Sequence, residues 1–277
     1  MKLTKTIRTT VVILSLAMIF SGCSLNKNTK TAHENKIEKS TTTNSEQKKD
    51  EINPKKSDEN DTYRLLAQKD YKSGDLMVEQ VNGGKSTLDA KEWSGPKIDF
   101  ADLDNQNRTG VATAFLDKSN YGKSEGREGQ TWAPTGWHNQ AKKVNGKRVF
   151  PQNRGHLIAY TITFNLDNDG RTKNGALGSI DNPKNLFTQS AYSNQRPFQI
   201  FEEKVRTSLK NGSKVTYRVQ PVFRGSELMA RGVWAQAVSD TGDLNFNIYL
   251  YNVEPGVAFD YNSGQSSLDP QMKVKDK

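Results

Sequence analysis

The chain has 277 residues, of which 33% are hydrophobic and 26% charged, and its formal net charge is +9. This length and composition allow one medium-sized domain with a sizeable core, together with a segment that is clearly polar. Cys23 is the only cysteine of the chain, which excludes an intramolecular disulfide.

The first 23 residues have the pattern of an export signal. Three basic residues precede the apolar run 11–20, which is too short to predict a membrane span. The run ends in Phe20-Ser21-Gly22-Cys23, which resembles the lipobox of bacterial lipoproteins, with Phe20 where Leu is usual. We therefore expect Cys23 to be lipidated and the protein to be anchored to the membrane by this lipid alone, outside the cytoplasm. The alternative is an ordinary secretory signal, after which the protein would be released.

Residues 24–60 consist mainly of Lys, Glu, Asn, Ser and Thr, with eight Lys against seven Asp and Glu. Such a segment cannot bury enough apolar surface to offset its conformational entropy, so we predict a disordered tether. The remaining residues, 61–277, form the predicted folded domain and carry a net charge of +5. A moderately basic domain is compatible with a polyanionic substrate but does not require one.

In the first half of the domain we expect a short helix at 63–71 and strands at 75–81 and 111–116. The irregular segment 119–140 contains Trp132 and Trp137, which could line a groove, although we favour a role in anchoring loops to the core. Asn145-Gly146 predicts a tight hairpin that leads into a strand ending near residue 156. We expect a second strand at 157–164.

A polar loop, 165–182, precedes the predicted main helix. Because an interior proline would break a helix, Pro197 places the start near Ser193 or Asn194, and Asn211-Gly212 marks the end. The expected buried side of this helix is Phe198, Ile200, Phe201, Val205 and Leu209. Three β-rich runs, 214–223, 227–238 and 244–253, predict an antiparallel sheet, and we expect the tail after residue 256 to be loosely held.

Polar residues at fixed spacing follow Asn153-Arg154-Gly155-His156. On a helix, positions 194, 198, 202 and 206 each advance only about 40° around the axis, so Asn194, Glu202 and Arg206 would share one face. An amide, a carboxylate and a guanidinium near an imidazole are an unusual choice for a core. They suit a metal ion and a phosphate.

The Asn-Arg-Gly-His sequence resembles the Asp-Arg-Gly-His motif of the DNA/RNA non-specific endonucleases, the ββα-metal nucleases, which include secreted and DNA-entry nucleases of bacteria. Asn185, Gln189 and Asn194 match the family spacing Asn-x3-Gln-x4-Asn. The resemblance implies an α+β fold in which an antiparallel sheet carries a ββα-metal finger, two strands and a metal-binding helix. It also implies Mg²⁺-dependent endonucleolytic hydrolysis of DNA and RNA with little sequence preference, leaving 5′-phosphate ends, with Mn²⁺ as a substitute metal.

Within this resemblance, His156 is the general base, because the neutral form of an unperturbed imidazole is available near neutral pH. Asn194 is the metal ligand, since Mg²⁺ keeps most of its waters and needs few protein oxygens; its alternative role is a helix N-cap. Glu202 holds a metal-bound water or Arg206, and the alternative is an exposed salt bridge between the two.

The remaining predicted site residues bind phosphate or support the finger. Arg154 and Arg206 neutralise phosphate charge. Asn185 and Gln189 position the waters of the metal or the finger itself, and Gly155 permits a tight backbone beside the base. Asn153 stands where the family usually has Asp, which keeps the shape but loses a charge. Arg108 and Arg127 are candidate contacts to the nucleic-acid backbone, with a surface role in a loop as the alternative for Arg108.

Two other functions fit parts of the sequence. One is a catalytically silent surface lipoprotein that holds DNA without cutting it. The other is a cell-envelope protein whose basic surface meets anionic wall polymers. No small-molecule cofactor is expected, and the sequence leaves the oligomeric state open.

Overall fold

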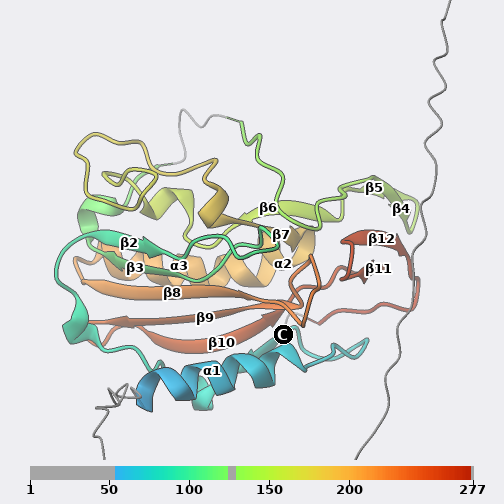
Figure 1. Ribbon diagram of the computed structural model, residues 1–277, viewed down its shortest axis with the longest axis horizontal. Coiled ribbons are helices and arrows are strands. Elements are labelled where there is room, and N and C mark those ends of the chain that lie inside the picture. The colour runs from blue at the N-terminus through green and yellow to red at the C-terminus, as the bar shows by residue number, and fades with distance from the viewer. Residues whose placement is uncertain (1–53, 124–128, 276–277) are drawn as a thin grey trace, which may run out of the picture. The chain divides into compact units, whose positions relative to one another are not determined.

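The computed structural model describes residues 54–123 and 129–275 (Figure 1). The predicted signal peptide, Cys23, Arg127 and most of the predicted tether lie outside these residues. Helix α1, Pro54–Ala67, begins within the segment that we predicted to be disordered. Its Glu59 carboxylate lies 2.6 Å from the Arg218 guanidinium, so the end of the tether is part of the fold. No helix of the described ranges is long and apolar enough to cross a membrane.

A six-stranded antiparallel sheet, with strand order β1-β10-β9-β8-β3-β2, forms the centre of the domain. Its strands are β1 (Val78–Gln80), β2 (Lys97–Phe100), β3 (Ala112–Leu116), β8 (Val215–Val222), β9 (Gly232–Ser239) and β10 (Asn245–Tyr251). This confirms the predicted antiparallel sheet and its three long C-terminal strands. The predicted runs were one or two residues too long at most ends, and the second began five residues too early, because residues 227–231 are irregular.

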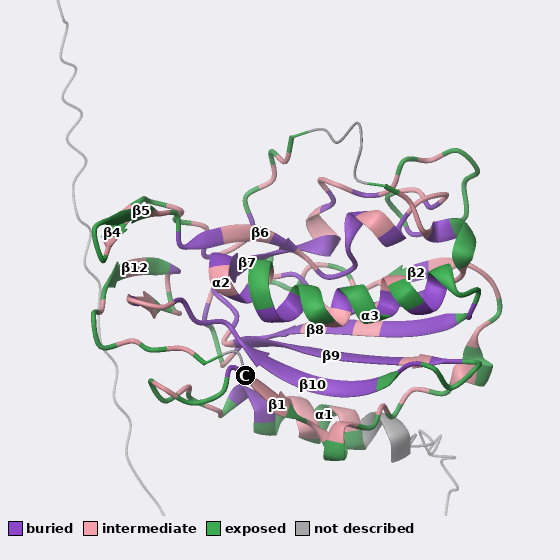
Figure 2. Ribbon diagram, turned by 180° about the vertical axis from the view of Figure 1, so that it is seen from behind, coloured by how far each residue is buried: buried purple, intermediate pink, exposed green. Residues whose placement is uncertain are grey.

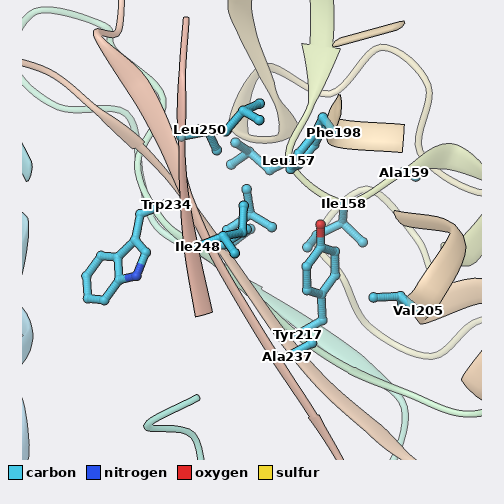
Figure 3. Close-up of a cluster of buried hydrophobic side chains, with 14 of the residues drawn as sticks. Leu157, Ile158, Ala159, Phe198, Val205, Tyr217, Trp234, Ala237, Ile248 and Leu250 are labelled. Atoms are coloured by element: carbon cyan, nitrogen blue, oxygen red, sulfur yellow. The ribbon is translucent and has the colours of Figure 1, made fainter. Parts of the chain in front are cut away.

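Helices cover both faces of the sheet. Adjacent residues of a strand point to opposite faces. On β8, Arg218 pairs with Glu59 of α1 on one face of the sheet. Tyr217 lies on the opposite face, where the charges of Glu202 and Arg206 affect the pKa of its hydroxyl. Figure 3 shows Tyr217, Ile248, Leu157 and Phe198 together on that second side of the sheet, where the main core lies.

The finger consists of two strands and a helix. Strand β6 (Gln152–His156) pairs antiparallel with β7 (Leu186–Ser190), and β7 leads directly into α2 (Ala191–Ser193). A π-helical turn (Asn194–Phe198) and α3 (Gln199–Lys210) continue the helix. The ββα fold is thus confirmed, but the second strand lies at 186–190 and not at 157–164. The run after His156 is buried almost throughout, so it enters the core as an irregular segment with a short 3₁₀ helix (Tyr160–Ile162).

The helix begins at Ala191, earlier than predicted, because Ser190 caps it: its Oγ accepts a hydrogen bond from the Ser193 amide at 3.0 Å. Pro197 therefore lies inside the helix. The π turn accommodates it, since a wider turn relieves the clash of a proline ring with the preceding carbonyl. The helix ends at Lys210, as predicted, but Ile200 is 46% exposed and not buried.

Two hairpins lie at the far end of β6 (Figure 1). Strands β4 (Lys142–Val144) and β5 (Lys147–Val149) join through Asn145 and Gly146, whose positive φ angles match the predicted tight turn. Strands β11 (Val257–Asp260) and β12 (Gln265–Leu268) belong to the tail. The tail is therefore ordered, contrary to our prediction, and the Tyr261 hydroxyl attaches it by donating to the Asn252 carbonyl at 2.9 Å.

Residues 252–254 hold the junction between β7 and the helix. Asn252 Oδ1 accepts from the Ser190 amide at 2.6 Å, and Ser190 Oγ donates to the Val253 carbonyl at 2.6 Å. One Glu254 Oε2 accepts from the Tyr192 amide in the first helical turn at 2.7 Å. Burial raises the pKa of the Glu254 carboxyl to about 7, although the Tyr192 amide opposes this shift.

This raised pKa predicts that the folding stability depends on pH. The ordinary Glu pKa is 4.5, so between there and about 7 the folded state binds more protons than the unfolded state. Stability therefore falls as the pH rises through this window, by up to about 3 kcal/mol. Glu254→Gln keeps the acceptor for Tyr192 but does not titrate, so its free energy of unfolding should lose this decline. Urea unfolding of both proteins between pH 4.5 and about 7 measures this difference. If the free energy of unfolding changed with pH in the same way in both proteins, the raised pKa of Glu254 would be contradicted.

Candidate active site

A polar cleft of about 570 Å³ lies between β6 and the finger helix. Six of the predicted site residues line it: Asn153, Arg154, His156, Asn194, Glu202 and Arg206. They come from two segments that are about forty residues apart in the sequence. The pairing of β6 with β7, followed at once by the helix, is what brings the two segments together.

His156 is the last residue of β6 and is half-buried in the cleft wall. Its Nε2 lies 2.9 Å from the Ile180 carbonyl oxygen. A carbonyl only accepts hydrogen bonds, so Nε2 carries the proton and donates it. In the neutral imidazole the lone pair is then on Nδ1, which is the atom able to take a proton.

Asn194 is the first residue of the π turn and is partly exposed in the cleft. Because Ser190 caps the helix, the alternative N-cap role of Asn194 is wrong. Within the described residues, neither the Asn194 nor the Asn153 side chain has a hydrogen-bonding partner, so both amides are available to a ligand. The π turn also shifts the helical register: Phe198 points into the core, and Gln195 and Gln199 line the cleft in its place.

Glu202 and Arg206 form a pair that is mostly buried. Their side chains are 11% and 19% exposed, and Arg206 Nη1 lies 3.8 Å from Glu202 Oε2. The alternative of an exposed salt bridge is therefore wrong. Arg206 Nε also contacts the exposed Glu203 at 2.7 Å, which fixes the guanidinium from the other side. Beneath them, burial and then the Glu202 charge raise the pKa of the Tyr217 hydroxyl, because its ionised form would lie in the core near a negative charge.

Arg154 is held rigidly at the opposite wall. Its Nε donates to the Trp132 carbonyl at 2.6 Å, and its guanidinium lies 4.5 Å from the centre of the Trp137 ring. Trp137 lines the cleft, so for this residue the groove interpretation applies, whereas Trp132 does not line it and contributes its backbone carbonyl to Arg154. A fixed guanidinium loses little entropy when it binds an anion.

Asn185 and Gln189 support the finger from behind and do not line the cleft. The Asn185 side chain accepts from the Ile158 amide at 2.9 Å and donates to the Ile158 carbonyl at 3.0 Å, which fixes the segment after His156. Gln189 donates to Ser193 Oγ at 2.9 Å and thereby joins β7 to the helix. Of the two roles predicted for these amides, the geometry favours holding the finger.

One further predicted site residue of the described ranges, Arg108, does not line this cleft. Arg108 is bound to its own chain: its Nε contacts Asp104 at 2.7 Å and its Nη1 donates to the Gly225 carbonyl at 2.7 Å. We therefore leave Arg108 out of the site. Arg127 lies outside the described residues, and His138 is exposed and does not line the cleft.

The cleft also contains polar residues that sequence reasoning missed, namely Gln130, Asn139, Gln152, Tyr160, Thr161, Gln195 and Gln199. Gln195 and Gln199 are four residues apart, as expected for one face of a helix. The sequence analysis assumed a regular helix, in which Asn194 and Phe198 face the cleft, and therefore did not select these two residues. For the others, the path of the loops and of β6 decides their position, and no spacing in the sequence indicates it.

Comparisons with known proteins identify the family and support the fold. Residues 89–241 match the DNA/RNA non-specific endonuclease family, and the chain belongs to this family. The family membership and the ββα fold define the protein as a nuclease, a hydrolase that acts on nucleic acid.

Solved structures of nucleases resemble the chain. The crystal structure of NucA from Streptococcus agalactiae with magnesium ion bound has a TM-score of 0.62 and 26% identity, covering 77% of this chain and 97% of that one. Sda1 nuclease with bound zinc ion has a TM-score of 0.53 and 21% identity, with coverages of 69% and 97%. The second likeness supports the fold alone.

The close approach of Gln189 to Gly155 yields a test of the finger. A Cβ on Gly155 would lie 2.2 Å from Gln189 Oε1 and 2.8 Å from Gln189 Cβ. Gly155→Ala should therefore destabilise the protein by about 1–3 kcal/mol, as overpacking does, and should displace the adjacent His156 and reduce nuclease activity. Gly129→Ala is the matched control, since no atom lies within 4 Å of a Cβ there. Equal melting temperatures of the two variants would contradict the prediction.

Proposed function

We propose that the cleft hydrolyses phosphodiester bonds of DNA and RNA in a metal-dependent reaction with His156 as the general base. One observation carries the proposal: a tethered imidazole, an amide available to a ligand and two guanidinium groups line one polar cleft. This set supplies each function that the reaction needs, since an attacking water must lose a proton while negative charge accumulates on the phosphoryl oxygens.

His156 takes the proton from the attacking water. The hydrogen bond from Nε2 to the Ile180 carbonyl orients the ring and fixes the tautomer, so the proton moves to Nδ1. The same carbonyl stabilises the imidazolium that forms, because Nε2 remains a donor. This role resembles that of the carboxylate or carbonyl partner found behind other catalytic histidines.

Asn194 is the proposed ligand of the metal ion. The described residues contain no group of three or more His, Cys, Asp or Glu that could hold a metal, so a cage of charged ligands is absent from them. A site with a single neutral amide ligand fits Mg²⁺, which keeps several waters and is bound by one or two protein oxygens together with substrate phosphate. When bound, Mg²⁺ would neutralise charge on the phosphoryl group and the leaving oxygen. Mn²⁺ accepts the same oxygen ligands and would substitute.

The charged and amide side chains around Asn194 bind and orient the substrate. Arg154 and Arg206 bind phosphate oxygens, and Glu202, which also lines the cleft, holds Arg206 in place and would accept a hydrogen bond from a water of the metal. Asn153 contributes a neutral amide where the family motif usually has Asp, which leaves the cleft with less negative charge. Magnesium in the NucA crystal structure supports the choice of metal.

Substrate and location follow from the family and the sequence. Contacts through phosphate oxygens carry no base information, which accounts for low sequence preference and for action on both DNA and RNA. The family resemblance implies 5′-phosphate products. The lipobox-like end of the signal peptide supports a protein that acts outside the cytoplasm and is anchored through Cys23.

Plasmid degradation tests the site and the function together. We expect cutting that requires Mg²⁺, stops with chelator, and falls by about 10²- to 10⁴-fold in His156→Ala, because a positioned base contributes that factor. Asn194→Ala should abolish cutting at low Mg²⁺ and recover partly at high Mg²⁺.

His138→Ala is the matched control for loss of an imidazole, since His138 is exposed and outside the cleft, and it should cut normally. Intact plasmid from the unmodified folded protein would overturn the enzyme and favour a DNA-holding protein. Equal loss in His138→Ala and His156→Ala would overturn the assignment of the base.

A further inference from the structure

The excess positive charge of the domain is concentrated in one stretch beside the cleft. Residues 61–277 carry 29 Lys and Arg against 24 Asp and Glu. Residues 129–166 contain five of these cations and not a single acid, so the rest of the domain is balanced, with 24 residues of each sign. Four of the five cations, Lys142, Lys143, Lys147 and Arg148, belong to the β4–β5 hairpin, and the fifth is Arg154 in the cleft.

The hairpin is an extension of the cleft wall. Asn139 and Gln152, which flank it, both line the cleft, and the Gln152 amide donates to Asn139 Oδ1 at 3.0 Å. The turn end of the hairpin is held in place, because Val144, which precedes the turn, packs so closely on Gly256 that a Cβ there would lie 2.5 Å from Val144 Cγ1. Figure 2 shows the hairpin as a largely exposed arm at the end of β6.

Among the residues that the structure describes, the cations of this hairpin have no acidic partner. Within the described part of the chain, none of the four forms an ion pair. Lys143 and Arg148 lie directly opposite each other in the β4–β5 register, a like-charge pair that destabilises a hairpin. An anion bound across the pair would remove this repulsion. The arrangement therefore costs stability in the free protein and is relieved by a polyanion.

An exposed aromatic ring accompanies these charges. Phe150 is 49% exposed at the root of the hairpin, and the Arg148 guanidinium lies 5.1 Å from the centre of its ring. Cationic side chains interleaved with exposed aromatic rings are typical of surfaces that follow a nucleic-acid backbone and stack on unpaired bases.

We propose that the β4–β5 hairpin is a second nucleic-acid contact, which binds phosphates of the substrate strand beyond the cleft. Lys143 and Arg148, on one face of the hairpin beside Phe150, bind the backbone, and Lys147 extends the positive charge to the other face. Phe150 stacks on a base where the strand is unpaired. The hairpin thus makes long substrates bind better than fragments that span only the cleft. This inference rests on the proposed function for its substrate class, but its test does not depend on turnover.

The test is the salt dependence of DNA binding by the full chain, measured by fluorescence anisotropy with the metal chelated so that no cleavage occurs. One variant combines Lys143→Gln, Lys147→Gln and Arg148→Gln. The matched control combines Lys72→Gln, Lys85→Gln and Lys91→Gln, three exposed lysines that do not line the cleft. Each protein is titrated with a long duplex and with a short oligonucleotide that fills only the cleft.

Each phosphate contact contributes about 0.9 to the slope of log affinity against log salt for duplex DNA. The hairpin variant should therefore lower this slope by roughly 2 to 3 and weaken long-duplex binding by roughly tenfold at low salt, with a smaller loss for the short oligonucleotide. Slopes equal to those of the control would overturn the proposal. A hairpin variant that no longer binds a glycerol-phosphate wall polymer but binds DNA as the unmodified protein does would also overturn the proposal.

Two results separate this proposal from the proposed function. A chain that binds DNA with the expected difference in slope but never cuts plasmid would retain the hairpin contact and lose the nuclease activity. A chain that cuts plasmid with Mg²⁺ while both triple variants keep the same slope would retain the nuclease activity and lose the hairpin contact.

Discussion

The orientation of the finger on the sheet depends on the hydrogen bonds of the buried Asn252 side chain. Its Oδ1 accepts from the Ser190 amide at 2.6 Å, while its Nδ2 donates to the carbonyls of Thr188 and Ala230 at 3.1 and 2.9 Å. One fully buried amide thus connects β7, the start of the helix and the segment before β9. Because an unpaired amide is costly in a core, the satisfied network fixes a single orientation of the finger on the sheet. The position of Asn194, only four residues after Ser190, follows from that orientation.

The π turn connects the part of the helix held by Asn252 to the residues that line the cleft. It allows Pro197 inside a helix that the sheet anchors at Ser190, and it turns Phe198 into the core while Gln195, Gln199 and Glu202 line the cleft. Irregular turns of this kind occur often at functional sites, where a regular helix would place a ligand group wrongly. Here the same π turn accommodates Pro197 and places polar side chains along the cleft.

Much of the fold could be predicted from local patterns. The three long C-terminal strands, the Asn145-Gly146 hairpin and the end of the helix at Lys210 each follow from a short-range rule on alternation, turn chemistry or helix stop signals. The strand expected at 157–164 was wrong because that apolar run is buried on all sides, and burial of that kind leaves no periodicity that distinguishes a strand from an irregular core segment. The tail was misjudged because its contacts, such as that from Tyr261 to Asn252, come from elsewhere in the chain.

The sequence by itself determined the family, the chemical types of the site residues and the convergence of two linked motifs, because these depend on residue identity and spacing. Only the tertiary structure decided which residues share the cleft. It separated Arg108 from the site, assigned Asn185 and Gln189 to the support of the finger, and brought Gln199 into the cleft wall. The physical reason is that a side chain's partners are set by hydrogen bonds and packing between distant segments, and the short-range periodicity of a sequence contains no information about them.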